Sequence, residues 1–307
     1  MSKRRTVGRL VNGLLIYDKP PALSSNQALQ EVKRLFFARK AGHGGSLDPL
    51  ATGMLIICLG EATKFSQFLL EADKQYTTTA QLGVQTTTGD SEGDVVETRP
   101  IPSLTHAQVE KVLAQFRGKI SQVPSMYSAL KYQGKPLYEY ARKGIDIARE
   151  SRDIMIYDLQ LVELTPESLR LSIRCSKGTY IRTLVEDIGK AIGCGAHVSA
   201  LRRDAIGPFS AEQMVTREQI QKAAEQSACD QYLIPTETLV QHWPSLNITS
   251  MMAFYMQQGH AVQVPKAPTS GWVRLNDKSG QFIGVGEVLP DGRIGPKRIL
   301  KTTEHLV

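Results

Sequence analysis

The chain has 307 residues, which exceeds the usual size of one domain and predicts two. Hydrophobic residues make up 41% and charged residues 22%, a balance typical of a globular protein that folds without a disulfide or metal staple. The formal net charge of +7 favours a polyanionic partner, although charge alone does not distinguish RNA from DNA or an acidic membrane.

The four cysteines are scattered and form no Cys-x-x-Cys pair, so we expect neither a structural zinc site nor a disulfide framework. The apolar run Leu14–Ile16 is too short for the core of a signal peptide. No segment approaches the roughly 20 apolar residues of a membrane helix. These features predict a soluble cytoplasmic protein that does not enter the membrane.

The first half of the chain alternates short apolar runs with turn residues. Leu14–Tyr17 predicts a buried strand, and the capping-box pair Ser24 and Gln27 predicts a helix after it. The polar, glycine-rich stretch from Ala41 to Thr52 predicts a loop without regular structure. Four further segments follow: a strand or buried helix at 55–59, a Thr-rich strand at 76–82, a polar turn at 86–93, and a helix after Thr105.

In the second half, strands are expected at 159–164 and 169–175. The helix after Thr179 has the clearest periodicity, since its apolar residues recur at i, i+3, i+4 and i+7. A short helix is expected at 250–258, followed by strands at 272–275, 282–288 and 298–300. We place a domain boundary at residue 248, followed by a small, basic, β-rich module.

The most informative stretch is residues 42–53, which combines four glycines and a proline with one acid, Asp48, and one imidazole, His43. This composition suits a fixed loop whose backbone closely approaches a ligand. Asp-Pro is also a common turn initiator, and from the residues alone an ordinary surface turn is the favoured interpretation.

The loop, continued through residues 60–64, resembles the catalytic segment of the bacterial tRNA pseudouridine synthases that modify uridine 55 of the TΨC arm, the TruB family. Five further segments match that family in the same order. They are Asp18–Pro20 with Ser24–Asn26, Lys74–Tyr76 with Leu82–Gly83, Pro124–Lys131, Ser176–Arg182, and Gly195–His197 with Leu201–Arg203.

The resemblance implies an α+β fold with a mixed, largely antiparallel central sheet flanked by helices, the pseudouridine synthase fold. It divides the chain into a catalytic domain, residues 1–248, and a small β-barrel-like PUA-type RNA-binding module, residues 249–307. It also implies that residues 124–152 form an insertion that clasps RNA. The tyrosines and cations of this insertion suit stacking on bases and contacts with phosphates.

The resemblance further implies an isomerase that converts uridine 55 in the TΨC loop of tRNA to pseudouridine, with the T-arm stem-loop as its partner and with no cofactor or metal. Asp48 matches the nucleophile, and attack on carbon 6 of the base or carbon 1 of the ribose stays open. Arg182 matches the cation that keeps the carboxylate ionised. Tyr76 matches the ring that stacks on the flipped base, and its phenol could assist proton removal from carbon 5.

Seven other positions match residues of the family that contact RNA or line the pocket. Four of them have an ordinary alternative: Tyr180 and Leu201 could be core residues, Asp90 a turn residue, and His43 a structural histidine. The substrate-binding residues implied by the resemblance are His43, Tyr180, Leu201, Asp90, Lys19, Lys64 and Lys131.

Three positions depart from the family pattern: Gly44 and Ser46 in the loop, and Ala22 where glycine is common. Two other functions stay open, a tRNA-folding chaperone that needs no chemistry and a different base-flipping enzyme. A zinc deaminase is disfavoured because the chain lacks His-x-Glu with Pro-Cys-x-x-Cys. We expect a monomer without an obligate protein partner, because RNA rather than a second subunit would complete the site.

Overall fold

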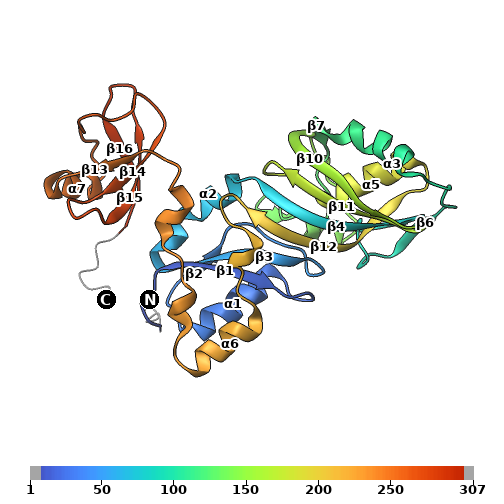
Figure 1. Cartoon of the computed structure of the whole chain (residues 1–307), viewed down its shortest axis with the longest axis horizontal. Coiled ribbons are helices and arrows are strands. Elements are labelled where there is room, and N and C mark those ends of the chain that lie inside the picture. The colour runs from blue at the N-terminus through green and yellow to red at the C-terminus, as the bar shows by residue number, and fades with distance from the viewer. Residues whose placement is uncertain (1–7, 301–307) are drawn as a thin grey trace.

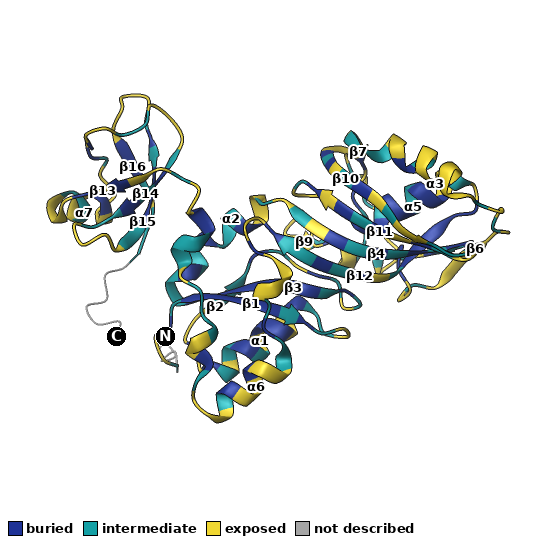
Figure 2. Ribbon diagram, in the orientation of Figure 1, coloured by how far each residue is buried: buried dark blue, intermediate teal, exposed yellow. Residues whose placement is uncertain are grey.

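The computed structural model describes residues 8–300, so the first seven residues of the basic N-terminal segment and the last seven of the C-terminal module lie outside it. A large sheet with its helices forms the greater part of the molecule, and a small β-rich module lies at one end (Figure 1). The strands β1 and β3 are buried along their length, whereas the loops and the outer helix faces are exposed (Figure 2).

The central sheet has eight strands in the order β1-β3-β12-β4-β11-β10-β7, with β2 paired to β3. These strands are β1 (Gly13–Lys19), β2 (Ala41–His43), β3 (Thr52–Leu59), β4 (Lys74–Leu82), β7 (Gly118–Gln122), β10 (Arg152–Leu164), β11 (Ser168–Cys175) and β12 (Ala196–Ile206). All neighbours are antiparallel except β3 and β12, which pair in parallel at Arg202–Thr52 and Arg203–Gly53. The expected mixed, largely antiparallel sheet is confirmed.

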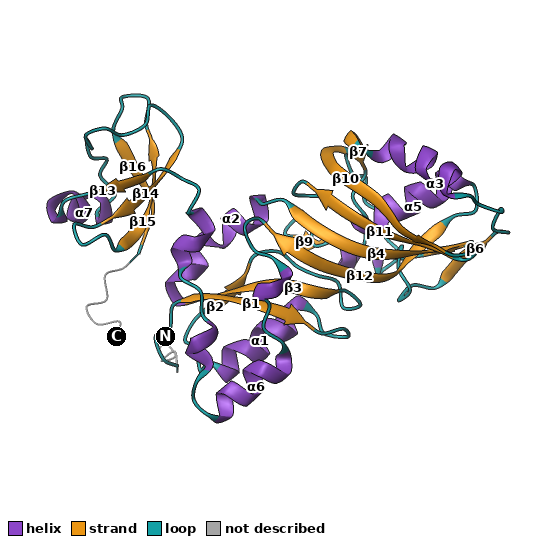
Figure 3. Ribbon diagram, viewed as in Figure 1, coloured by secondary structure: helices purple, strands orange, loops and turns teal. Residues whose placement is uncertain are grey.

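Helices cover this sheet in two groups (Figure 3). The helices are α1 (Ser25–Leu35), α2 (Ser66–Glu71), α3 (His106–Leu113), α4 (Leu137–Ala141), α5 (Ile181–Ile192) and α6 (Arg217–Glu225), with a 3-10 helix, η1 (Gly60–Phe65), before α2. The helices α3 and α5 pack on the half of the sheet that contains β10 and β12, and α1 and α6 pack beside β1 and β3. The apolar stripe of α5 is buried as predicted, and the helix ends at Gly193 with φ of 102°.

Two small hairpins extend from this body. One pairs β5 (Val84–Thr86) with β6 (Val95–Thr98), and the other pairs β8 (Lys131–Tyr132) with β9 (Lys135–Pro136). The second hairpin and α4 lie within residues 124–152, the segment that the family resemblance predicts to be an insertion and that is called the insertion below.

Local signals predicted several element starts correctly. The capping boxes at Ser24 and Thr105 are both formed. The glycine-rich stretch was wrongly expected to hold no regular structure, because its first three residues form β2 against β3. The strand expected from 159 begins seven residues earlier, at Arg152, where pairing with β7 extends it. The strand β12 was not predicted, since charged residues interrupt its alternation and its neighbours β3 and β4 stabilise it.

The C-terminal module is a four-stranded sheet in the order β13-β14-β15-β16 with one helix. Its elements are β13 (Ser245–Asn247), α7 (Ser250–Gln257), β14 (Trp272–Asn276), β15 (Phe282–Val288) and β16 (Ile294–Ile299). The sheet therefore starts three residues before the boundary expected at 248. Aromatic rings join the module to η1 and α2: Phe68 lies edge-on to Trp243 and Trp272, at centroid distances of 5.0 and 5.3 Å.

Candidate active site

The loop between β2 and β3 that carries Asp48 is held by hydrogen bonds on both sides of that residue. The Ser25 hydroxyl, in the first turn of α1, accepts from the Leu47 amide at 2.7 Å and donates to the Leu47 carbonyl at 3.0 Å. The Ala22 amide donates to the Pro49 carbonyl at 2.9 Å. The backbone on either side of Asp48 is thus tied to the segment at the start of α1.

Ala22 makes that contact in a left-handed backbone conformation, with φ of 64°. An alanine adopts this region at a cost of roughly 1 kcal/mol relative to the right-handed region, whereas glycine does so freely. The conformation explains why glycine suits this position and shows that Ala22 keeps the turn despite the strain.

Lys19, at the end of β1, lies beneath the same loop and is fully buried. Its ammonium donates to the carbonyls of Pro20, Leu23 and Pro49 at 2.9, 2.7 and 3.3 Å. Burial lowers the pKa of Lys19 to about 8, although the nearby Asp48 carboxylate opposes this. The structure therefore places Lys19 where it supports the loop rather than on an exposed surface.

Arg182 connects the loop to the other half of the sheet. It lies in the first turn of α5, and its guanidinium contacts two carboxylates: Nε lies 3.1 Å from Asp48 and Nη1 lies 3.2 Å from Asp90. It also donates to the backbone carbonyls of Thr88 at 2.9 Å and Tyr127 at 2.8 Å. The side chain of Arg182 is 8% exposed and that of Asp90 3%, whereas Asp48 keeps 36% of its surface. The site thus presents Asp48 to solvent and hides the two groups behind it.

Burial raises the pKa of the Asp48 carboxyl, and the Arg182 guanidinium opposes that rise. Asp90 adds to the increase by like-charge repulsion, while Lys19 and Arg203 lower the pKa. Asp48 is thus a carboxylate with weakened solvation and several surrounding cations. Such an environment favours a reactive anion over a hydrated one.

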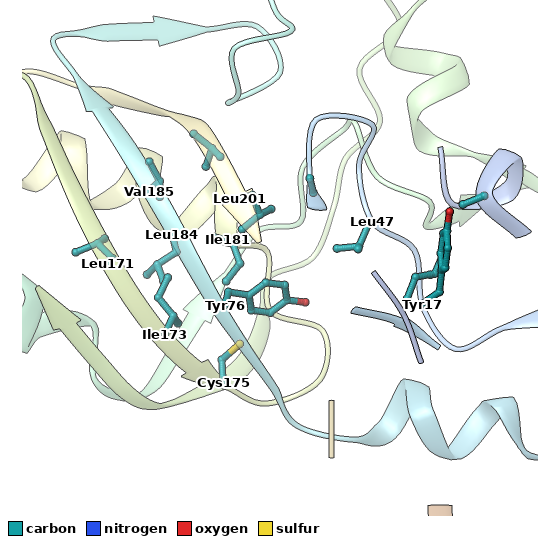
Figure 4. Packing of buried hydrophobic residues seen from close by; sticks show 14 of the residues in the cluster. Tyr17, Leu47, Tyr76, Leu171, Ile173, Cys175, Ile181, Leu184, Val185 and Leu201 are labelled. Carbon is teal, nitrogen blue, oxygen red and sulfur yellow. The ribbon is translucent and has the colours of Figure 1, made fainter. Parts of the chain in front are cut away.

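Tyr76 projects from β4 toward this loop, and Figure 4 shows its hydroxyl directed toward the side on which Leu47 lies. Leu201 of β12 and Ile181 of α5 pack beside the ring as members of the same buried cluster. Burial raises the pKa of the Tyr76 phenol, and the Arg203 guanidinium opposes this. The ring is therefore a neutral phenol at neutral pH.

Tyr180 precedes α5, and its backbone amide donates to the Gln122 side chain at 3.1 Å. Burial raises the pKa of its phenol, and the Ser128 hydroxyl of the insertion opposes this. His43, in β2, is half-buried. Burial and the charge of Arg203 lower the pKa of its imidazole, so it is neutral at pH 7.

Besides Lys19, three of the expected substrate-binding residues lie elsewhere or face inward. Asp90 is buried against Arg182 and also accepts from the Glu92 amide, so it supports the arginine from behind instead of occupying an exposed position. Lys64 donates to Glu61 and to the Ile299 carbonyl of the C-terminal module, at 2.5 and 2.8 Å. Lys131 is exposed on the insertion. Their roles in RNA binding stay predictions.

Two buried residues that the sequence interpretation did not assign to the site contact its loop: Ser25 and Arg203. Both lie in segments quoted for the family resemblance. Recognising β12 as a strand would have revealed Arg203, because residues two apart share a face and Leu201 was already assigned to the pocket.

The packing of Leu69 against the loop explains why position 44 is a glycine. A Cβ atom at this position would lie 2.3 Å from the Leu69 side chain, so no larger residue fits without moving α2 or the loop. The leucine occupies the space that a side chain at position 44 would need, and the loop is packed there instead of being loosened.

Within residues 8–300, no three His, Cys, Asp or Glu side chains are grouped so that they could hold a metal ion. In the same part of the chain, no helix is long and apolar enough to cross a membrane.

Comparison with known families identifies the relatives of this chain. The model described as TruB family pseudouridylate synthase (N terminal domain) matches residues 33–181, and two TruB C-terminal models match 182–241 and 244–300. A tRNA pseudouridine synthase B from Coxiella burnetii (strain RSA 493 / Nine Mile phase I) is 55% identical over 95% of this chain and 96% of its own. The chain belongs to the TruB family of pseudouridylate synthases. It is therefore a pseudouridine synthase, an isomerase.

Other relatives agree with this assignment. A tRNA pseudouridine synthase B from Vibrio vulnificus (strain YJ016) is 52% identical over 97% of this chain and 98% of its own. Among solved structures, a chain in the crystal structure of a Cbf5-Nop10-Gar1 complex matches with a TM-score of 0.70 and 25% identity, over 90% of this chain and 78% of that one. A chain in an H/ACA RNP bound to a substrate RNA matches with a TM-score of 0.69 and 23% identity, over 94% and 84%. The fold of the TruB-family member is thus shared with these assemblies.

Proposed function

We propose that this TruB-family enzyme converts uridine 55 in the TΨC loop of tRNA to pseudouridine, with Asp48 as the nucleophile that attacks a base turned out of its stack. The relatives' name, tRNA pseudouridine synthase B, supports tRNA as the substrate. The reaction breaks the N-glycosidic bond and rejoins the same ribose to carbon 5 of the same base. Because it is redox-neutral, a positioned carboxylate can carry it without a co-reactant.

The observation that carries the proposal is a partly exposed carboxylate anchored by a buried arginine. Asp48 is 36% exposed and lies 3.1 Å from Arg182, which is 8% exposed. A nucleophilic carboxylate in a pocket closed by RNA must stay ionised, and an adjacent cation stabilises that form. Asp90 fixes the other edge of the guanidinium, so Arg182 has one orientation toward Asp48.

Tyr76 suits a stacking role. A flipped base is normally held against an aromatic or apolar surface, and Tyr76 with Leu201 supplies one beside the Asp48 loop. The raised pKa of Tyr76 keeps its phenol protonated. Its environment therefore supports stacking on the base more than direct removal of the proton from carbon 5.

An Asp48→Asn variant tests the nucleophile, with Asp187→Asn as its matched control. Asp187 lies on α5, has the same 36% side-chain exposure, and pairs with Lys190 at 3.4 Å. Pseudouridine is mapped by primer extension on a T-arm transcript incubated with pure protein and no cofactor. We expect modification at uridine 55 with wild type and Asp187→Asn, and none with Asp48→Asn. Full modification by Asp48→Asn, or release of free uracil by wild type, would contradict the proposal.

A tRNA-folding activity that needs no chemistry is the second candidate. Tyr132 and Tyr138 of the insertion are exposed and could stack on unpaired bases. If Asp48→Asn still binds and refolds tRNA while it forms no pseudouridine, the protein has both activities.

A further inference from the structure

Arg203 of β12 contacts the backbone both before and after Asp48. Its Nη2 donates to the Gly45 carbonyl at 3.3 Å and its Nη1 to the Ser46 carbonyl at 3.2 Å, on the limb before Asp48. Its Nε donates to the Met54 carbonyl at 2.7 Å, in the strand β3 that follows the loop. One side chain therefore links the part of the loop before Asp48 to the strand that follows the loop.

This arginine is 2% exposed and is among the largest fully buried side chains of the described residues. A buried guanidinium is costly unless its donors are satisfied, and here three backbone carbonyls satisfy donors at both of its edges. No carboxylate lies within salt-bridge distance of it among residues 8–300. The hydrogen bonds of Arg203 therefore depend on where the backbone lies and not on the charge of an acidic side chain.

The sheet register places Arg203 between β3 and Tyr76 of β4. On one side it pairs with Gly53 of β3, and on the other it pairs with Tyr76 of β4. A Cβ atom at Gly53 would lie 2.3 Å from the Arg203 carbonyl oxygen, so glycine permits this close approach. The parallel pairing of β3 and β12 covers only two residue pairs, which makes Arg203 part of the narrow junction between the two halves of the sheet.

We propose that Arg203 is a positioning residue for the isomerisation: its guanidinium ties the part of the Asp48 loop before Asp48 to β3 and to β12, so that Asp48 and Tyr76 meet the same base. The inference rests on the proposed function for the roles of Asp48 and Tyr76. Arg203 itself does not touch the substrate, because it is 2% exposed and three of its donors bind backbone carbonyls.

The charge of Arg203 adds a second, measurable effect. The guanidinium lowers the pKa of Asp48 and that of Tyr76. Removing the charge should therefore raise the pKa of Asp48. The acid limb of the rate profile, on which activity is lost as the carboxylate becomes protonated, should then move to higher pH.

Two variants separate the effect of the planar guanidinium shape of Arg203 from the effect of its positive charge. Arg203→Lys keeps the charge and the aliphatic stem, but its single nitrogen cannot reach carbonyls at both edges of the former guanidinium. Arg203→Gln removes the charge as well. The matched control is Arg202→Gln, since Arg202 is adjacent in β12 but partly exposed and pairs with Asp18 at 2.8 Å instead of with the loop.

Amide hydrogen exchange of residues 44–52 measures the loop directly and requires no catalysis. Single-turnover rates and RNA affinity are then measured on a T-arm stem-loop. We expect faster exchange in both Arg203 variants, and a rate that falls roughly 10- to 100-fold with unchanged RNA affinity, because small misplacements of reacting groups are that costly. The acid limb should move to higher pH in Arg203→Gln and stay in place in Arg203→Lys. Arg202→Gln should match wild type throughout.

Wild-type exchange or a wild-type rate in Arg203→Lys would overturn the proposal, and so would an unmoved acid limb in a folded Arg203→Gln. If Arg203→Gln does not fold, Arg203→Lys decides alone. A merely structural role would lower the melting temperature without moving the acid limb. If Asp48→Asn proves active, the proposed function fails, whereas loop exchange in Arg203→Lys still tests whether Arg203 holds the loop.

Discussion

Two aspartates share one arginine in this structure, and we predict that their removal changes stability in opposite directions. Asp48 is 36% exposed and its pKa is raised, so the ionised carboxylate is less favourable in the folded protein than in water. Asp90 is 3% exposed and accepts from Arg182, the Thr88 hydroxyl and the Glu92 amide. Asp48→Asn should therefore stabilise the fold, and Asp90→Asn should destabilise it.

The size of each change in unfolding free energy follows from the exposure of the aspartate and from the partners that Arg182 keeps after the substitution. Solvent screening limits the gain from Asp48→Asn to about 1 kcal/mol, because a third of the side chain is exposed and Arg182 keeps Asp90 as its counter-ion. Asp90→Asn breaks a buried ion pair and turns an amide donor toward a guanidinium donor, which costs about 3 kcal/mol. Both variants should lose activity. Stability should rise while activity falls only in Asp48→Asn, whereas both should fall in Asp90→Asn.

Urea unfolding at pH 7 and again at lower pH provides the measurement. A carboxyl whose pKa is higher in the folded state than in the unfolded state destabilises the fold fully above the folded pKa and not at all below the unfolded one. Wild type should therefore approach Asp48→Asn in stability as the pH falls through the raised pKa of Asp48. Asp187→Asn serves as the surface control.

The reasoning is refuted if Asp48→Asn unfolds at lower urea than wild type at pH 7, or if its advantage grows as the pH falls. Either result would mean that the Arg182 ion pair outweighs the burial of Asp48. A neutral effect of Asp90→Asn would show that Arg182 does not depend on its buried partner.

Three further changes test how the loop is supported. Ala22→Gly should raise the unfolding free energy by about 1 kcal/mol, because φ is 64° there, and an unchanged urea midpoint would argue against the strain. Lys19→Met should lower the unfolding free energy by about 1–3 kcal/mol, because buried carbonyls lose their donor. Calorimetry should detect this loss, and a stability equal to wild type would show that those contacts contribute nothing. Gly44→Ala should lower the unfolding free energy by about 1–3 kcal/mol and slow catalysis, because its Cβ would overlap Leu69. A wild-type melting temperature and rate would show that α2 moves to accommodate the Cβ without a cost in stability.

Sequence alone determined the features that depend on neighbours along the chain. The capping boxes at Ser24 and Thr105 fix helix starts through contacts three residues away, and the apolar spacing of α5 identifies its buried face. The combination of Asp48, Tyr76 and Arg182 was predicted from the resemblance of six ordered motifs to the TruB family.

Only the tertiary structure decided how these residues are supported. Arg182 reaches Asp48 across 134 positions of sequence and Asp90 across 92, and Arg203 reaches Gly45 across 158. Whether a charged side chain is exposed or buried depends on which distant backbone closes over it, and local propensity holds no information about that. The physical reason is that burial and hydrogen-bond partners are set by long-range packing. The proposed nucleophile could therefore be named from sequence, while the support that Ser25 and Arg203 give to its loop could not.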